Sequence, residues 1–253
     1  MKVAIVTPTI GSPELAECLA SVQNQTYENI THYVFLDGEE HFEKINPILQ
    51  NAQSNKEIKT IEIQDNVGKG WLGHRVYAAC SFLVNADVIC YLDQDNWFDP
   101  DHVERLLSKI ENGYDWAYSL RKIYDKDGNY LFNDDCESLG KWPIYLNDEA
   151  FLIDTSSFAV KKDVAVRVGH AWYDVNRPKA ADRQFFHVLK THVPNYACSG
   201  AYTLNYRLGG NVNSVSKEFF EEGNAVMKKR YPNGYPWTKK AIAEIAPGIT
   251  LIE

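Results

Sequence analysis

The sequence predicts an α/β fold with a mainly parallel, Rossmann-like central sheet flanked by helices. Over residues 2–112, short apolar runs typical of buried strands alternate with stretches that carry apolar residues at helical spacing. Such alternation is typical of strand–helix–strand units joined by right-handed crossovers. The chain has 253 residues, enough for one large α/β domain or two small ones. We expect residues 1–112 and residues 113–253 to be two halves of one domain, with helices at its C-terminal end.

In the first half, strands are expected at residues 2–7, 33–36 and 59–63. Ser12 and Pro13 open the first helix, and residues 43–52 form the second. After a turn at residues 68–70, a third helix should bury one apolar face. The side chains expected to be buried are Leu15, Cys18, Leu19 and Val22 in the first helix, and Leu72, Val76, Ala79 or Cys80, and Leu83 in the third.

The segment DVICYLDQDNWFDPD, residues 87–101, is the centre of the predicted fold and site. Residues 88–92 are typical of a buried strand, and the apolar run ends abruptly in four polar residues. Asp99 and Pro100 have the character of the N-cap and first position of a helix, and Gly113 follows the expected end of that helix. The polar residues after the strand are Asp93, Gln94, Asp95 and Asn96, and the apolar face of the helix is Val103, Leu106, Leu107 and Ile110.

Two carboxylates two residues apart therefore lie at the carboxyl end of a buried strand, where ligands bind in open α/β sheets. Asp-x-Asp spacing alone is more often a solvated turn. At the mouth of a buried strand, however, the two carboxylates repel each other and lose solvation, so positive charge should compensate them. Few Lys or Arg residues are close in sequence, and oxygen ligands suit Mg²⁺ or Mn²⁺. Residues 7–9, Asp37 and Asp65 also end predicted strands and should meet at this edge, although a single Asp after a strand is commonly a turn residue.

After Gly113 the regular alternation ends. Strands are expected at residues 115–119, 156–160 and 202–208, and a hairpin joins residues 122–124 to 130–132. Residues 133–154 have no clear period and are expected to form a loop over the site, where Trp142 and Tyr145 are either stacking surfaces or core. Helices are expected at residues 163–168, from residue 180 onward with Phe186, Leu189 and Val193 inward, and at residues 217–231.

Charge and composition exclude several classes of function. The formal net charge of −8 argues against a general nucleic-acid binder or a protein of anionic membranes. The five cysteines are scattered without CxxC spacing and are expected to be small buried hydrophobes. No apolar run reaches about 18 residues, and the first residues are strand-like, unlike a signal peptide. We therefore expect a soluble, cytoplasmic protein without a transmembrane segment.

Residues 3–110 resemble the nucleotide-binding half of a GT-A-fold glycosyltransferase, most similar to the family 2 group. The matching pieces occur in the family's order and roughly its spacing: VAIVTPTIG, LAECLASVQNQTY, VFLDG, NVGKGWLGHR and YLDQDN. The second half matches loosely, through SSFAVKKDV and AADRQFF. The resemblance implies a nucleotide-sugar-binding half at residues 1–112 and an acceptor-side half at residues 113–253. The Gln-x-x-Arg-Trp motif of processive synthases is absent, which favours transfer of one sugar.

The resemblance also implies roles for individual residues in binding the donor. Asp37 would hydrogen-bond the base, with uracil the commonest, so UDP-sugars are favoured. Asp93 would contact the ribose or a metal-bound water, and Arg75 would reach the base or a phosphate. The implied nucleotide-binding set is Thr7, Pro8, Thr9, Asp37, Asp65, Gly68, Arg75, Asp93 and Gln94.

By the same resemblance, Asp95 would hold Mn²⁺ or Mg²⁺ against the diphosphate, with Asp93 as the second ligand. Asp182 takes the place of the carboxylate that activates the acceptor hydroxyl. Two departures from the family pattern stand out, because Leu36 precedes Asp37 and Ala181 precedes Asp182 where an acid is common. An Asp at a helix start is also explained by the helix dipole alone. The segment from Arg207 through Gly209, Gly210 and Asn211 either closes over the diphosphate or is an ordinary turn.

These residues predict a metal-dependent transfer. The metal would offset charge on the departing nucleoside diphosphate, and Asp182 would take the acceptor's proton in a direct, inverting attack. The acceptor hydroxyl is not identified by any motif. Three alternatives stay open: a sugar-phosphate nucleotidyltransferase, which usually has a Gly-rich basic loop after the first strand; a glycoside hydrolase with two carboxylates; and a non-catalytic nucleotide-sugar-binding module.

Overall fold

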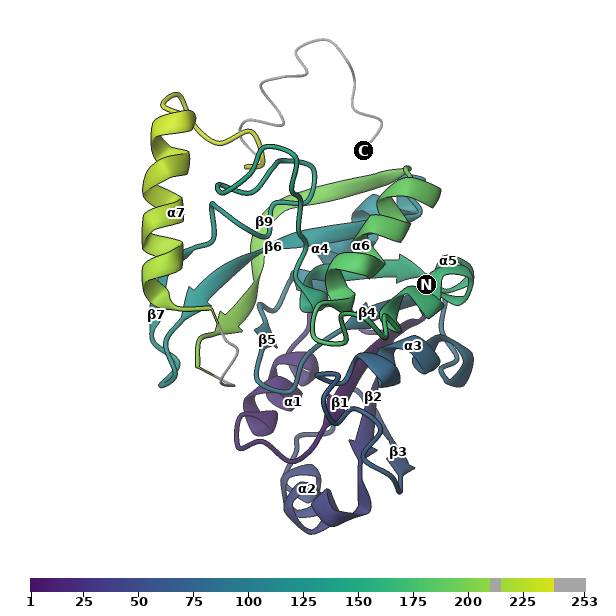
Figure 1. The fold of residues 1–253 in the computed structure, drawn as a ribbon. Helices are drawn as coiled ribbons and strands as arrows, with labels where there is room; N and C mark the ends of the chain where they lie inside the picture. Colours follow the sequence, from purple (N-terminus) through teal and green to yellow (C-terminus); the bar gives the residue numbers. More distant parts are fainter. Residues whose placement is uncertain (210–214, 239–253) are drawn as a thin grey trace.

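The computed structural model describes residues 1–209 and 215–238 and confirms the predicted α/β class (Figure 1). Its curled central sheet has the strand order β3-β2-β1-β4-β8-β6-β9-β5, with β7 paired to β6. The strands are β1 Val3–Thr9, β2 Ile30–Asp37, β3 Glu57–Ile63, β4 Val88–Tyr91, β5 Trp97–Phe98, β6 Trp116–Tyr124, β7 Tyr130–Asn133, β8 Phe158–Lys161 and β9 Tyr196–Arg207. The α-helices are α1 Leu15–Gln23, α2 Phe42–Gln50, α3 His74–Leu83, α4 His102–Glu111, α5 Lys162–Val168, α6 Ala181–His192 and α7 Lys217–Arg230.

The first four strands pair in parallel, and three of them, β1, β2 and β4, are buried on both faces, whereas the edge strand β3 is largely exposed. Because side chains alternate along a strand, Val3 and Ile5 of β1 pack with α1 and α4, whereas Ala4 and Val6 pack on the opposite face with α3. The same alternation divides the four residues of β4 between the two cores. Apolar residues on both faces explain why these strands are continuous hydrophobic runs in the sequence. Their parallel direction brings the carboxyl ends of β1, β2 and β4 to one edge.

The second half extends the same sheet with mostly antiparallel pairs. β8 pairs antiparallel with both β4 and β6, while β6 and the long strand β9 run parallel. The β6–β9 register shifts near Leu120, and such irregularities bend a strand. The bend is visible in Figure 1, where β6 and β9 curve toward α7. Helix α7 packs beside β7, with Phe220 and Phe132 ring centroids 6.4 Å apart.

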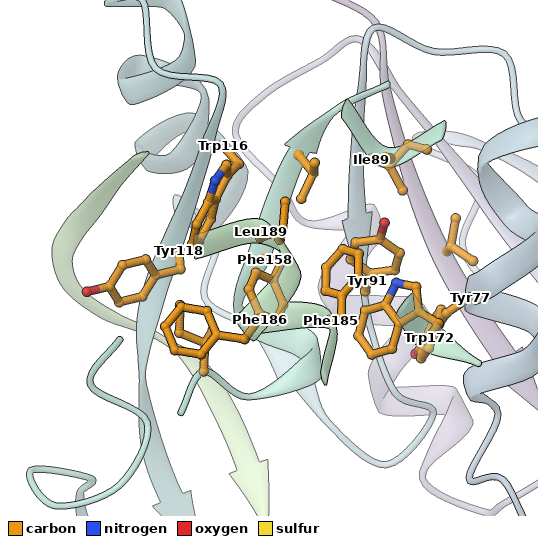
Figure 2. Packing of buried hydrophobic residues seen from close by; sticks show 14 of the residues in the cluster. Tyr77, Ile89, Tyr91, Trp116, Tyr118, Phe158, Trp172, Phe185, Phe186 and Leu189 are labelled. Carbon is orange, nitrogen blue, oxygen red and sulfur yellow. The ribbon is translucent and has the colours of Figure 1, made fainter. Parts of the chain in front are cut away.

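A cluster of aromatic side chains holds α6 against the sheet (Figure 2). The rings of Trp172 and Phe185 stack with centroids 4.1 Å apart. Both rings also contact Tyr91 of β4, at 5.2 and 5.6 Å. Full burial of rings of this size contributes several kcal/mol. The first turn of α6 is therefore fixed relative to the carboxyl end of β4.

Two predictions about helices were wrong in detail. Helix α4 begins at His102, with Asp101 at the N-cap, because Trp97 and Phe98 form the short strand β5 on β9. The Asp99 side chain instead accepts hydrogen bonds from Lys122 Nζ and Asn205 Nδ2.

The buried face of α3 also differs from the expected one, because Leu72 and Leu83 are 42% and 55% exposed. Leu72 lies before the helix with a φ of 51°, and Tyr77 is buried in its stead. The longest helix in the described ranges, α7, has 14 residues, and none there combines the length and apolar character that crossing a membrane requires.

Candidate active site

A cleft of about 460 Å³ lies at the carboxyl ends of β1, β2 and β4, beside the start of α6. The structure brings together in its lining eight of the residues that the sequence singled out, which are Pro8, Thr9, Asp37, Gly68, Asp93, Gln94, Asp95 and Asp182. Lining residues that sequence reasoning did not select include Asn66, Lys69, His74, Asn96, Asp154, Thr155, Lys179 and Tyr206. The strand-end side chains and the first turn of α6 therefore face one space.

Asp37 and Gly68 form one wall of the cleft. The Asp37 carboxylate accepts hydrogen bonds from the backbone N–H groups of Val67 and Gly68, both at 2.8 Å. Burial raises the pKa of Asp37, and these two hydrogen bonds oppose the rise. A methyl group at Gly68 would overlap the Asp37 carboxylate. Glycine is therefore required here by the close approach of Asp37.

Gln94, between the two acids of the Asp-x-Asp motif, fastens the loop after β1. Its Oε1 accepts hydrogen bonds from Thr9 Oγ1 at 2.7 Å and from the N–H groups of Ile10 at 3.1 Å and Ser12 at 3.2 Å. Thr9 Oγ1 in turn accepts a hydrogen bond from the Gly11 N–H at 3.0 Å. The end of β4 and the loop after β1 thus form one hydrogen-bonded unit.

Besides Asp37, four carboxylates line the cleft, those of Asp93, Asp95, Asp154 and Asp182. Burial and the neighbouring Asp95 raise the pKa of Asp93 well above its ordinary value, although Tyr77 donates a hydrogen bond to it at 2.8 Å. Burial, with Asp154 nearby, raises the pKa of Asp95 to about 6. The pKa of Asp182 is also raised to about 6, again chiefly by burial. The cleft is therefore rich in carboxylates, and Asp93, Asp95 and Asp182 form no salt bridge within the described residues.

Positive charge in the cleft is scarce. Among the described lining residues the ammonium groups are Lys69 and Lys179, and burial lowers the pKa of His74. Arg207, behind Asp95, lowers that residue's pKa slightly but pairs with Glu17. A cluster of raised carboxyl pKa values in a cleft is typical of a functional site.

The residues present fit a hard divalent cation held together with a ligand. In the described part of the chain, no group of three His, Cys, Asp or Glu side chains is arranged to hold a metal ion alone. Mg²⁺-type sites commonly use one or two carboxylates and complete their shell with substrate phosphates and water. Asp95 and Asp93 match that donor set, since both carboxylates lie in the cleft and neither forms a salt bridge within the described residues.

Asp154 is held in place by a buried arginine that sequence reasoning missed. Arg121 of β6, 3% exposed, donates to Asp154 at 2.7 Å and to Asp134 at 2.8 Å, and also pairs with Glu137. Its guanidinium carbon lies 4.6 Å from the ring centroid of Tyr206. Arg121 therefore joins the loop at residues 133–154 to the cleft. No periodic or spacing signal marks it, because its partners are spread over irregular chain.

Some predicted residues lie outside the cleft lining. Thr7 is buried, with its Oγ1 2.9 Å from His32 Nε2. Asp65 is exposed on the turn after β3, and the Arg75 guanidinium lies 5.9 Å from the rings of Trp71 and Tyr173.

The predicted turn near the diphosphate is described only in part, because Gly210 and Asn211 lie outside the described residues. In the loop at residues 133–154, Trp142 and Tyr145 pack against the core, on Trp237 and Phe219 respectively, and neither lines the cleft.

The chain is similar to known proteins in sequence and in fold. The profile described as Glycosyl transferase family 2 matches residues 4–165. An uncharacterized glycosyltransferase of Methanocaldococcus jannaschii is 26% identical over 137 residues, which are 51% of this chain and 44% of the relative. The chain thus spans less than half of that relative's length.

Crystal structures of S. aureus TarS share the fold. TarS 1-349 in complex with UDP matches with a TM-score of 0.60 and 14% identity, over 92% of this chain and 66% of TarS 1-349. The complex of the same protein with UDP-GlcNAc matches with a TM-score of 0.61 and 14% identity, over 92% and 67% of the two chains. These matches identify a GT-A fold.

Proposed function

This chain belongs to glycosyltransferase family 2, and from that membership we propose that it transfers one sugar from a nucleotide-diphosphate sugar to an acceptor hydroxyl. A UDP-sugar is the favoured donor, since the TarS structures that share the fold bind UDP and UDP-GlcNAc. The observation that carries the proposal is the single cleft that holds Asp93 and Asp95 together with Asp182. In this cleft, Asp93 and Asp95 would mark the end that binds the donor, and Asp182 would mark the end that binds the acceptor.

At the donor end, the loop after β1 and the turn at residues 66–70 would enclose the nucleoside. Asp37 already accepts two backbone hydrogen bonds, so its remaining lone pairs would be available to the base. Asp95 and Asp93 would hold Mn²⁺ or Mg²⁺ at the diphosphate. Such an ion, when bound, offsets the negative charge that develops on the leaving diphosphate. Lys179 and Lys69 would add positive charge at the same end.

At the acceptor end, Asp182 would accept the proton of the attacking hydroxyl. With a pKa of about 6, Asp182 is mostly ionised at neutral pH, yet it is a stronger base than an exposed aspartate. It stands in the first turn of α6, whose position is fixed by Phe185 and Trp172. Direct attack on the face opposite the leaving group would invert the anomeric carbon.

Calorimetric titration with UDP, GDP and ADP, each with and without Mn²⁺, tests the donor site. We expect Mn²⁺-dependent binding of UDP that is lost in Asp95→Ala and kept in Asp163→Ala, an exposed aspartate on α5. Absence of binding of every diphosphate in both conditions would refute the proposal. Once a donor sugar that the enzyme transfers is known, NMR of the product compares its anomeric configuration with that of the donor. Net retention of configuration would exclude Asp182 as a base in a single direct displacement.

A further inference from the structure

A second cavity, of about 640 Å³, lies between α6 and the loop at residues 137–152. Its lining includes the aromatic side chains of Phe151 and Phe186. It also includes the basic side chains of Arg177, Arg183 and Lys190, and the imidazole of His187. Arg177, Arg183 and Lys190 bring three positive charges to one cavity of a chain whose formal net charge is −8.

Three of the basic residues form a line along α6. Arg183, His187 and Lys190 are spaced i, i+4 and i+7, which places them on one face of the helix over about 10 Å. The Lys190 ammonium lies 3.5 Å from the ring centroid of Phe151, and burial lowers its pKa. Within residues 1–209 and 215–238, neither Arg183 nor Lys190 forms a salt bridge with a carboxylate. These cations therefore face the cavity without an acidic partner there.

Two acidic side chains, Glu137 and Glu149, also line the cavity. Glu137 is buried and already paired with Arg121. Glu149 is the other acid of the lining, and Arg177 is partly offset by Asp174, 3.2 Å away. Arg183 and Lys190 are therefore the cations of α6 in this lining that no salt bridge within the described residues neutralises.

The basic cavity and the acceptor end of the candidate active site are lined by neighbouring residues of α6. Arg183 follows Asp182 directly in α6, and its backbone N–H donates to the Asp182 carboxylate at 2.8 Å. On the other side, Glu137 of the basic cavity and Asp154 of the cleft are bound to the same Arg121 guanidinium. A molecule whose hydroxyl reaches Asp182 would therefore extend over Arg183 toward Lys190.

We propose that this cavity binds the acceptor, and that the acceptor carries an anionic group, a phosphate or a carboxylate, beside the sugar or alcohol that is glycosylated. The anionic group is held by Arg183 and Lys190, and its carbon skeleton rests on Phe151. This inference depends on the proposed function, because it names the acceptor class for the same reaction.

The test uses the full chain saturated with UDP and Mn²⁺. Glucose, its phosphate monoester and glucuronic acid are titrated in turn, so that the two anionic groups are compared with each other and with a neutral parent. The double variant Arg183→Gln/Lys190→Gln is compared with Lys228→Gln/Lys229→Gln, which removes two exposed cations of α7 outside the cavity. Circular dichroism checks that both variants are folded.

We expect at least one anionic sugar to bind about five- to tenfold more tightly than glucose, and this advantage to be lost in the Arg183/Lys190 variant only. The tighter of the two anions identifies phosphate or carboxylate as the recognised group. Equal binding of neutral and anionic sugars, no binding of either anion, or an advantage that survives the double variant would overturn the inference. UDP binding is measured in the same samples, so failure of the donor site is detected separately.

Discussion

Replacing Asp95 by asparagine is expected to stabilise the ligand-free protein while removing its metal-dependent binding of UDP. Burial near Asp154 raises the pKa of Asp95 from 3.8 to about 6. At neutral pH the folded protein therefore holds an ionised carboxylate in an unfavourable environment, whereas the unfolded chain exposes it to water. Asparagine has nearly the same shape without the charge.

The size of the effect follows from this pKa difference. One pKa unit corresponds to about 1.4 kcal/mol, so the shift of Asp95 corresponds to roughly 3 kcal/mol as an upper figure. We expect a gain of about 1–3 kcal/mol, or roughly 2–6 °C in Tm for a chain of this size. Because the folded pKa is raised, the unfavourable contribution is absent below pH 3.8 and complete above about pH 6. The stability difference between variant and parent should therefore grow as pH rises from 4 to 7.

Thermal unfolding in EDTA at the two ends of this pH range measures the effect in the parent, Asp95→Asn and Asp163→Asn. Calorimetry with UDP and Mn²⁺ then tests binding in the same proteins. A variant that is no more stable than the parent at neutral pH would refute the electrostatic reasoning, as would an equal gain at both pH values. If Asp95→Asn is more stable but no longer binds UDP with Mn²⁺, then the buried charge of Asp95 lowers stability and is required for binding, as expected of a functional site.

Three further changes probe other parts of the site. Asp182→Asn should lower kcat about 100-fold or more, with UDP affinity unchanged in calorimetry, and a variant of nearly full activity would exclude Asp182 as the base. Gly68→Ala should lower both Tm and UDP affinity because the methyl group displaces the Asp37 carboxylate, and parental values for both would contradict that contact. Arg121→Met leaves three buried carboxylates unpaired and should reduce the free energy of unfolding in urea by about 3–5 kcal/mol, whereas a neutral effect would show that the network relaxes.

Much of the fold could be predicted from the sequence because its first half is locally consistent. Strands with apolar residues on both faces, helices with one apolar face and polar strand ends all indicate the same parallel sheet. The predictions failed where a distant partner decides the structure. Trp97 and Phe98 form a strand only because β9 lies beside them, and that pairing moves the start of α4 to His102.

The sequence predicted those residues of the candidate site that lie at the ends of strands. Asp37 is the last residue of β2, and Asp93 and Asp95 come shortly after the end of β4, so topology alone brings them to one edge. Asp154 and Lys179 line the same cleft but come from irregular segments, where no period indicates which side chains turn inward. Arg121 was missed for a related reason, since alternation along β6 does not reveal that its neighbours in space are three acids.

The hydrogen bonds of Gln94 have a practical consequence for redesign by segment exchange. The loop after β1 is a natural segment to transplant between relatives when a different donor is wanted. Its conformation, however, depends on an acceptor oxygen supplied by a residue more than eighty positions later in the chain. A transplanted loop would therefore need the residue that occupies position 94 in the protein from which the loop is taken. The loop after β1 and the central residue of the Asp-x-Asp motif should be exchanged together.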